Sequence, residues 1–276
     1  MDEATLETWR GASAKQRVHL IDNVVAAAPS GFELSRGVSG ADLLPMFVHA
    51  RTATEWIFIP GGSFSMGLSA EEEKAARAIA DPPPLNIHEM RPCRVVTVRP
   101  FLVMKAPVTW SLVSRVLTVD DMEDRPEFDG PREAQPAYLH RDEIEALARA
   151  DHFRLPTEEQ WEWACRGGTR SLFFFGDTLP EDESLLASFV APDLRTCKPN
   201  PFGLLGLFVG EWCRDHFRPA YDQAPSQNDF CVRGGATVFW PWQGSEWAFC
   251  ISAMRMPSSD LAGGLCGARL VVDLAE

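Results

Sequence analysis

The stretch RLPTEEQWEWACRGG at residues 154–168 decides which fold this chain of 276 residues is expected to adopt. It holds a turn, a capped helix and a glycine stop in one short run. Thr157 is typical of a helix N-cap, and Gln160 follows it at the spacing of a capping box, with two glutamates at the positive end of the helix dipole. The stretch therefore predicts a short helix with Trp161 and Ala164 on its inward face.

Four further groups of strand and turn signals lie on either side of this stretch. They are IPGGSFSMG at residues 59–67, a strand region at 89–109, NPFGL at 200–204 with EW at 211–212, and VRGG at 232–235 followed by GARL at 267–270. In this order the segments resemble the formylglycine-generating enzyme and sulfatase-modifying-factor family. The resemblance implies an α+β fold, a variant of the C-type lectin architecture with little regular secondary structure.

The sequence departs from the family's pattern where the resemblance would place the reaction. Oxidases of the family carry a serine after the Arg-Gly-Gly run, then two cysteines that hold copper and activate oxygen. The corresponding residues here are Ala236, Phe239 and Gly244, and the loop TVFWPWQGSEW at residues 237–247 contains no cysteine. Soft Cu(I) needs thiolate or thioether ligands. We therefore predict that the copper centre and the catalytic residues of the oxidases are absent.

The calcium sites that the resemblance implies are also incomplete in sequence. Calcium takes six to eight oxygen ligands, many of them from carboxylates and amides. Ser188 stands where relatives carry an asparagine, and the run before Trp212 lacks a second asparagine, which leaves Glu211 as the single acidic candidate there. We expect neither calcium nor another cofactor.

Composition limits the classes of partner. The chain has 26 Lys and Arg against 39 Asp and Glu, a net charge of -13, which argues against nucleic acid and anionic membranes as general partners. The first residues, MDEATLE, lack a basic and then apolar leader, and no apolar run is long enough to span a bilayer. We expect a cytoplasmic protein whose seven scattered cysteines are reduced and mostly buried.

Residues 1–51 lie outside the resemblance, and we predict that they form a helical appendage to a domain at residues 52–276. Ser13 is placed to cap a helix that runs to about Ala28. A second short helix is expected after Ser39, because one side would collect the apolar residues Leu43, Leu44, Phe47 and Val48. The pair of helices is interpreted as a lid packed on the domain, with a docking element for a partner as the alternative.

The cysteine-free loop is rich in aromatic residues. Large amphipathic rings dominate recognition sites, so the loop predicts a groove that holds a peptide or small ligand. The alternative is that the tryptophans fill the space of the lost metal site and cap the core. The candidate ligand-binding residues are Phe239, Trp240, Trp242, Glu246, Trp247 and Arg255.

The leading hypothesis is a family member without formylglycine-forming activity that recognises a protein or peptide partner through this loop. A second hypothesis keeps an enzyme, an oxidase or modifying enzyme acting on a peptide or peptide-derived metabolite, with Cys250 or Glu246 recruited to a non-standard redox centre. A third is a variable receptor diversified by a retroelement, because such receptors share the fold.

Overall fold

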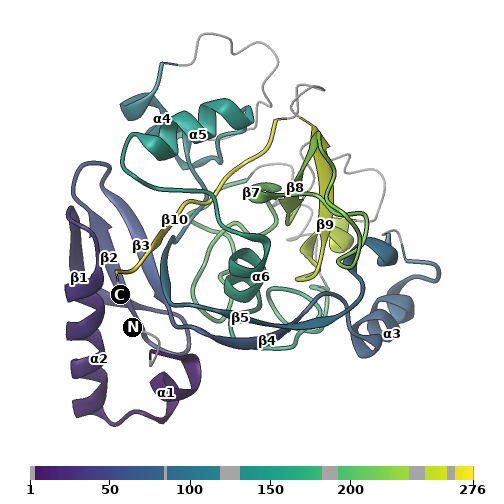
Figure 1. Ribbon diagram of the computed structural model, residues 1–276, viewed down its shortest axis with the longest axis horizontal. Helices are drawn as coiled ribbons and strands as arrows, with labels where there is room; N and C mark the ends of the chain where they lie inside the picture. The colour runs from purple at the N-terminus through teal and green to yellow at the C-terminus, as the bar shows by residue number, and fades with distance from the viewer. Residues whose placement is uncertain are drawn as a thin grey trace.

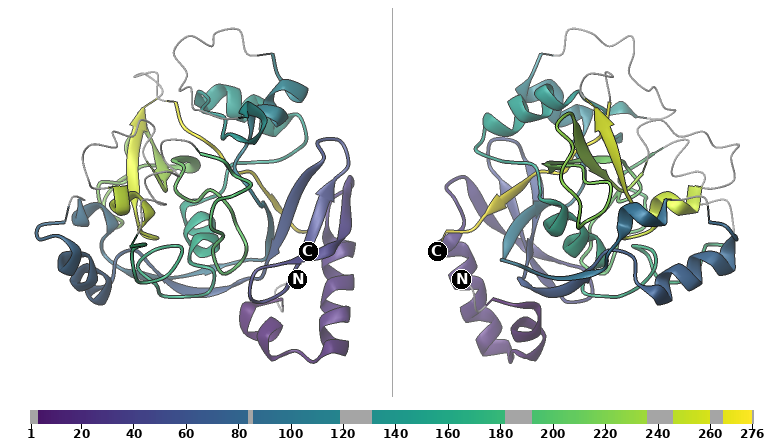
Figure 2. Two further views of the ribbon diagram at one scale, coloured as in Figure 1. Left: turned by 180° about the vertical axis from the view of Figure 1, so that it is seen from behind. Right: turned by 45° about the vertical axis from the view of Figure 1, so that its right-hand side comes forward.

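The computed structural model describes residues 4–83, 86–118, 131–181, 192–235, 246–259 and 265–275. Three antiparallel sheets surround one central helix, α6, and further short helices lie at the periphery (Figure 1). The two ends of the chain lie near each other on the side of the molecule that carries α2 (Figure 2). This arrangement confirms the α+β class predicted from the sequence.

The helix α6, Glu158–Arg166, is the one predicted from residues 154–168. The Gln160 amide donates to Thr157 Oγ1 at 3.1 Å, and the Thr157 amide donates to the Gln160 side chain at 3.1 Å, which completes the capping box. Gly167 ends the helix with a φ of 58°, a left-handed conformation that favours glycine. Every side chain of α6 except that of Glu159 is buried, so the inward face extends far beyond Trp161 and Ala164.

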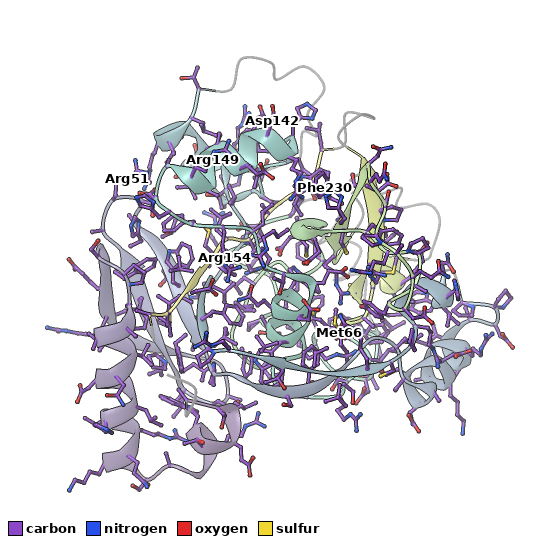
Figure 3. All side chains as sticks on the ribbon, viewed as in Figure 1. Arg51, Met66, Asp142, Arg149, Arg154 and Phe230 are labelled. Carbon is purple, nitrogen blue, oxygen red and sulfur yellow. The ribbon has the colours of Figure 1, made fainter. Side chains whose placement is uncertain are left out.

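The largest sheet has five strands in the order β1, β2, β3, β6, β10. These strands are Phe32–Ser39, Leu44–His49, Thr54–Ile59, Phe101–Met104 and Val271–Asp273. The central strand β3 is buried at Trp56 and at the three residues after it. The C-terminal strand β10 is tied to the centre of the molecule because Arg154 Nε donates to Asp273 at 2.7 Å (Figure 3).

Two smaller sheets flank α6. The strands β4, Gly62–Met66, and β5, Arg94–Val98, form an antiparallel pair in which Ser63 opposes Thr97. The other sheet contains β7, Glu211–His216, β8, Asp229–Arg233, and β9, Arg255–Ser259. The segments that carried the family resemblance therefore contribute residues of β4, β5, β6, β7 and β8, together with connecting segments at residues 200–204 and 267–270.

The remaining elements are short helices on the outside of these sheets. They are α1 (Leu6–Gly11), α2 (Ala14–Ala27), α3 (Ala70–Ile79), α4 (Trp110–Val116), α5 (Arg141–Arg149) and the 3-10 turns η1 (Ile87–Met90), η2 (Arg132–Ala134) and η4 (Glu246–Cys250). Among the described residues, no helix combines the length and the apolar character needed to cross a bilayer.

The N-terminal region corrects one prediction. The helix capped by Ser13 is present as α2, with a full capping box and an end at Ala28, although Val18 and Val25 on it are exposed. The predicted second helix after Ser39 is wrong, because β1 and β2 occupy this region and continue the sheet of β3. The predicted division between residues 1–51 and 52–276 stays a prediction.

The helix α1 is fixed to the rest of the molecule by specific contacts. The Leu6 amide donates to the Gly61 carbonyl at 2.8 Å. Trp9 is 1% exposed, and its indole N–H donates to the Asp42 carbonyl at 2.9 Å. Arg10 forms two hydrogen bonds of 2.8 Å with the Asp42 carboxylate. These contacts agree with a segment packed on the domain.

Candidate functional site

The structure describes only part of the predicted recognition loop. Phe239, Trp240 and Trp242 fall within residues 236–245, which lie outside the described residues. Glu246 is the first residue of η4. Trp247 is described and buried, with 6% of its surface exposed, and its ring meets the edge of Phe173 at a centroid distance of 6.4 Å.

The ends of this loop rest on firmly packed backbone. At its start, a Cβ atom on Gly235 would lie 1.7 Å from the Phe208 carbonyl oxygen, so only glycine fits there. Gly234 before it has a φ of 77°, which also favours glycine. At its end, the buried Trp247 anchors η4 in the core. The loop at residues 236–245 is therefore held at both ends by the scaffold.

Arg255 occupies a different environment from the one predicted. It is fully buried, and its guanidinium forms two hydrogen bonds of 2.8 Å with the Glu158 carboxylate. It also donates to the carbonyls of Glu89 at 2.8 Å and Arg218 at 2.7 Å. These partners make Arg255 a link between β9 and α6, and they occupy its guanidinium in the core.

Glu162, in the middle of α6, is the centre of a buried ionic cluster. Its carboxylate accepts hydrogen bonds from Arg233 at 2.5 Å, from Arg166 at 2.9 Å and from the Gly67 amide at 2.8 Å. Burial raises the pKa of Glu162, but the nearby Arg233 and Arg166 outweigh burial, so the pKa lies below its ordinary value. Arg166 is further paired with Glu72 at 2.7 Å. The cluster joins α6 to β8 and to the turn after β4.

Glu211, at the start of β7, forms a second buried pair. Its carboxylate accepts from Arg269 at 2.9 Å and from the Trp161 indole at 2.6 Å. Burial raises the pKa of Glu211 above its ordinary value despite the attraction of Arg269. Because these donors occupy both carboxylate oxygens, Glu211 serves the packing of α6. Ser188, the other residue considered for calcium, lies outside the described residues.

The cysteines are spread over the scaffold as thiols. Cys213 on β7 and Cys231 on β8 are fully buried neighbours, and burial raises the pKa of both. Cys250, considered above for an altered redox centre, is 1% exposed at the end of η4. Within the described ranges, no three His, Cys, Asp or Glu side chains gather as a metal site.

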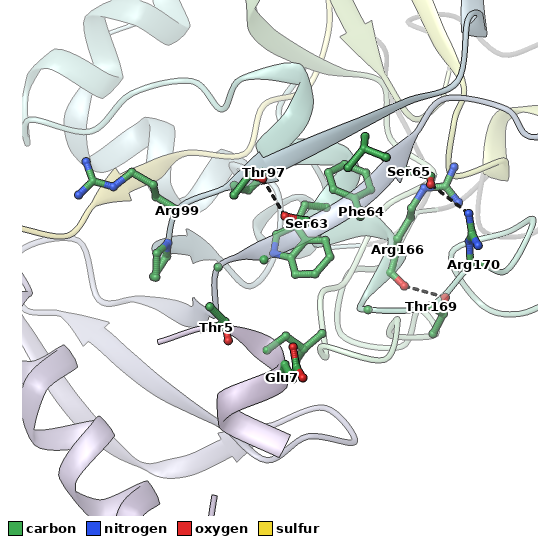
Figure 4. Close-up of a pocket in the computed structure, with 18 of the residues that line it drawn as sticks. Thr5, Glu7, Ser63, Phe64, Ser65, Thr97, Arg99, Arg166, Thr169 and Arg170 are labelled. Carbon is green, nitrogen blue, oxygen red and sulfur yellow. Dashed lines mark hydrogen bonds between the residues drawn. The ribbon is translucent and has the colours of Figure 1, made fainter. Parts of the chain in front are cut away.

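A groove of about 1060 Å³ lies between α1, the β4–β5 pair and the turn that follows α6 (Figure 4). Hydroxyl groups, arginines and two aromatic rings line it. The Ser63 and Thr97 hydroxyls are 2.7 Å apart, and Arg170 donates to Ser65 Oγ at 3.0 Å. The rings of Phe64 and Trp163 lie beside each other. Other lining residues are Thr5, Glu7, Arg10, Arg99 and Thr169.

The sequence-based reasoning missed this groove. Residues 59–67 were recognised as a strand and turn, yet the wall opposite comes from α1, which no motif indicated. The available signal was the alternation of Ser63, Phe64 and Ser65, which places two hydroxyls on one face of a strand.

Residues 44–274 match the family model of the sulfatase-modifying factor enzyme 1-like domain. The chain belongs to this family. A stretch of 99 residues is 36% identical to the serine/threonine-protein kinase pkn1 of Chlamydia pneumoniae. That stretch is 30% of this chain and 16% of the kinase, so the chain spans only a small part of that relative's length.

Two solved structures share the fold of this family member. PvdO from Pseudomonas aeruginosa is similar with a TM-score of 0.59 and 19% identity, over 82% of this chain and 97% of that one. Treponema denticola variable protein 1 is similar with a TM-score of 0.56 and 16% identity, over 88% of this chain and 99% of that one. At these identities the likeness concerns the fold alone.

Proposed function

We propose that this family member recognises a protein or peptide partner through the surface formed by residues 236–247 and does not form formylglycine. One observation carries the proposal: residues 236–245 contain no thiol, while they contain Phe239, Trp240 and Trp242. The donor set does not fit a thiolate copper centre. Aromatic side chains of this density are typical of recognition surfaces.

The geometry next to the loop supports a binding role. The buried pairs of Glu158, Glu162 and Glu211 with arginines give the surrounding scaffold fixed positions. A loop that begins at Gly235 and ends at the buried Trp247 starts from a rigid frame. Rigid support lowers the entropy that is lost on binding, which favours recognition.

The experiment compares partner binding by the wild type and by the double variant Trp240→Ala, Trp242→Ala. A peptide library displayed on beads is incubated with labelled protein, and retained sequences are titrated individually. We expect the double variant to lose at least about tenfold in affinity, because aromatic anchors carry most of the energy of such sites. Val18→Ala, a change on the exposed face of α2, is the matched control.

A second variant separates recognition from thiol chemistry. Cys250→Ala should leave the affinity for the retained peptides unchanged, because Cys250 is buried at the end of η4. Equal binding by the wild type and the double tryptophan variant, or turnover of a retained peptide that is lost in Cys250→Ala, would contradict the proposal.

A further inference from the structure

The strand β4 has one edge without a backbone partner in the described part of the chain, since β4 pairs with β5 alone. Gly61, one residue before β4, forms backbone hydrogen bonds along this edge. Its amide donates to the Ala4 carbonyl at 3.0 Å and its carbonyl accepts from the Leu6 amide at 2.8 Å. Backbone groups alternate between the two edges of a strand, so Ser63 and Ser65 direct theirs to the same edge as Gly61.

This edge opens into the groove. In Figure 4, β4 carries Ser63, Phe64 and Ser65 and lies between Thr97 of β5 and the residues around α1, Thr5 among them. Thr5 pairs with Gly61 in parallel, which shows that an extended backbone fits along this edge. An open edge next to an existing strand is a template for one more strand.

Arg170 gives the groove a charge preference. The Arg170 side chain is exposed, and its Nη2 donates to the neutral Ser65 hydroxyl at 3.0 Å. No carboxylate lies within ion-pair distance of Arg170 among the described residues. Two other arginines of the groove are paired, Arg166 with Glu72 and Arg10 with an aspartate. A guanidinium without a counter-charge is matched best by a carboxylate, which it binds with two parallel hydrogen bonds.

The floor of the groove suits alternating side chains. Ser63 opposes Thr97 and Ser65 opposes Val95, so these four side chains share one face of the β4–β5 pair. Phe64 lies on the opposite face, where its ring contacts Trp163. A strand with apolar and acidic residues in alternation would direct its acidic side chains to the face of Ser65 and Arg170, and its apolar side chains to the face of Phe64.

We propose that this groove binds an extended peptide that carries carboxylate side chains. The peptide adds to the open edge of β4 as a further strand, and one carboxylate pairs with Arg170. The inference goes beyond the proposed function because none of the lining residues named for this groove belongs to residues 236–247. The wall from α1 precedes residue 44, where the family match begins, so family membership does not imply the groove.

The test measures fluorescence anisotropy with an end-blocked, labelled octapeptide of alternating valine and glutamate. The full chain should bind this peptide saturably. Arg170→Gln should weaken binding by about tenfold, as expected for the loss of a charge-assisted hydrogen-bonded pair. Replacing the glutamates of the peptide with glutamine should have a similar effect. A peptide with N-methyl groups on every amide should lose binding, because neither of its edges can donate backbone hydrogen bonds to β4.

Three controls decide the interpretation. Arg149→Gln changes an exposed arginine of α5, outside the groove, and should bind like the wild type (Figure 3). The double variant Trp240→Ala, Trp242→Ala should also bind normally, which separates this inference from the proposed function. Absence of saturable binding, equal binding by Arg170→Gln with an unchanged melting temperature, or equal binding of the N-methylated peptide would overturn the inference. Binding of a single-stranded oligonucleotide that depends on Arg170, in place of peptide binding, would also overturn the inference.

Discussion

Glu162 shows how a single carboxylate organises the centre of this protein. Its side chain has no exposed surface and lies between the guanidinium groups of Arg166 and Arg233. Buried charges are costly unless they are paired and hydrogen-bonded, and here both oxygens have partners. The helix α6 is therefore held on its buried sides by ionic contacts as well as by its tryptophans.

We predict that Glu162→Gln destabilises the protein strongly. Removal of the carboxylate leaves two buried arginines without this counter-charge, which is expected to cost about 3–5 kcal/mol of unfolding free energy. Urea denaturation followed by circular dichroism measures the change. Glu55→Gln, which breaks an exposed pair with Lys105, is the control and should cost less than about 1 kcal/mol. A similar loss of unfolding free energy in the two variants would contradict the prediction that the buried cluster stabilises the protein more than an exposed ion pair does.

The same residue predicts a pH dependence. The pKa of Glu162 is below its ordinary value of 4.5 in the folded protein, so its contribution is complete above 4.5 and is lost as the pH falls through the folded pKa. The difference in unfolding free energy between wild type and Glu162→Gln should therefore shrink below pH 4.5. Glu211, whose pKa is raised, acts with the opposite sign and is unchanged in this comparison. A difference that stays constant into acid would contradict the assignment.

At the scale of elements, α1 is a short helix that depends on its contacts. Six residues are too few for a helix to be stable alone in water, so packing must hold it. Trp9 supplies much of this packing through its contact with Phe58, at a centroid distance of 6.0 Å, and its bond to the Asp42 carbonyl. Trp9 is therefore a major support of this wall of the groove, beside the contacts of Leu6 and Arg10.

We predict that Trp9→Ala loosens this wall. A buried tryptophan changed to alanine costs about 3–5 kcal/mol, and the loss should be concentrated at the N-terminus. Hydrogen exchange with mass spectrometry should show faster exchange in residues 4–12 and at Gly61, with α6 less affected. Val18→Ala on the exposed face of α2 should leave exchange unchanged. Uniform acceleration throughout the chain would show instead that α1 is part of the global core.

Elements with local signals were predicted well from sequence. Thr157 and Ser13 mark the starts of α6 and α2 because capping is a local interaction between residues three apart. The region after Ser39 was predicted wrongly as a helix. Its apolar residues fit one face of a helix, but they form the strand β2, which is buried on both faces and paired with β3. A short apolar run does not distinguish a buried strand from a buried helix.

The candidate sites depended on contacts between distant residues, which the sequence did not reveal. The sequence makes Arg255 a candidate ligand-binding residue, yet Glu158, ninety-seven positions earlier, binds it in the core. The groove brings together α1, β4 and Arg170, and its shape depends on the packing of α1 against Gly61. The loss of the thiols after Gly235 needed only the sequence, because an absent residue type excludes a ligand set wherever the loop lies.

At the scale of the whole molecule, the scaffold is that of the family, and we propose that the copper ligands of the oxidases are replaced. The buried ionic pairs of α6 connect the central helix to β8, to β9 and to α3, and hydrogen bonds with Gly67 connect it to the turn after β4. Fold and function are separable in this way because activity resides in a few residues placed on the scaffold. We therefore propose that the protein is a rigid frame with two recognition surfaces, the aromatic loop and the groove beside α1.

The most direct test of this account is an assay for aldehyde formation. Purified protein, supplied with Cu(I) under reducing conditions and with oxygen, is incubated with cysteine-containing peptides, and the products are followed by mass spectrometry. Because the loop at residues 236–245 offers no thiolate, we predict no conversion of cysteine to formylglycine above a protein-free control. Copper-dependent conversion that requires the protein would contradict the central claim and show that other residues of the chain form the redox centre.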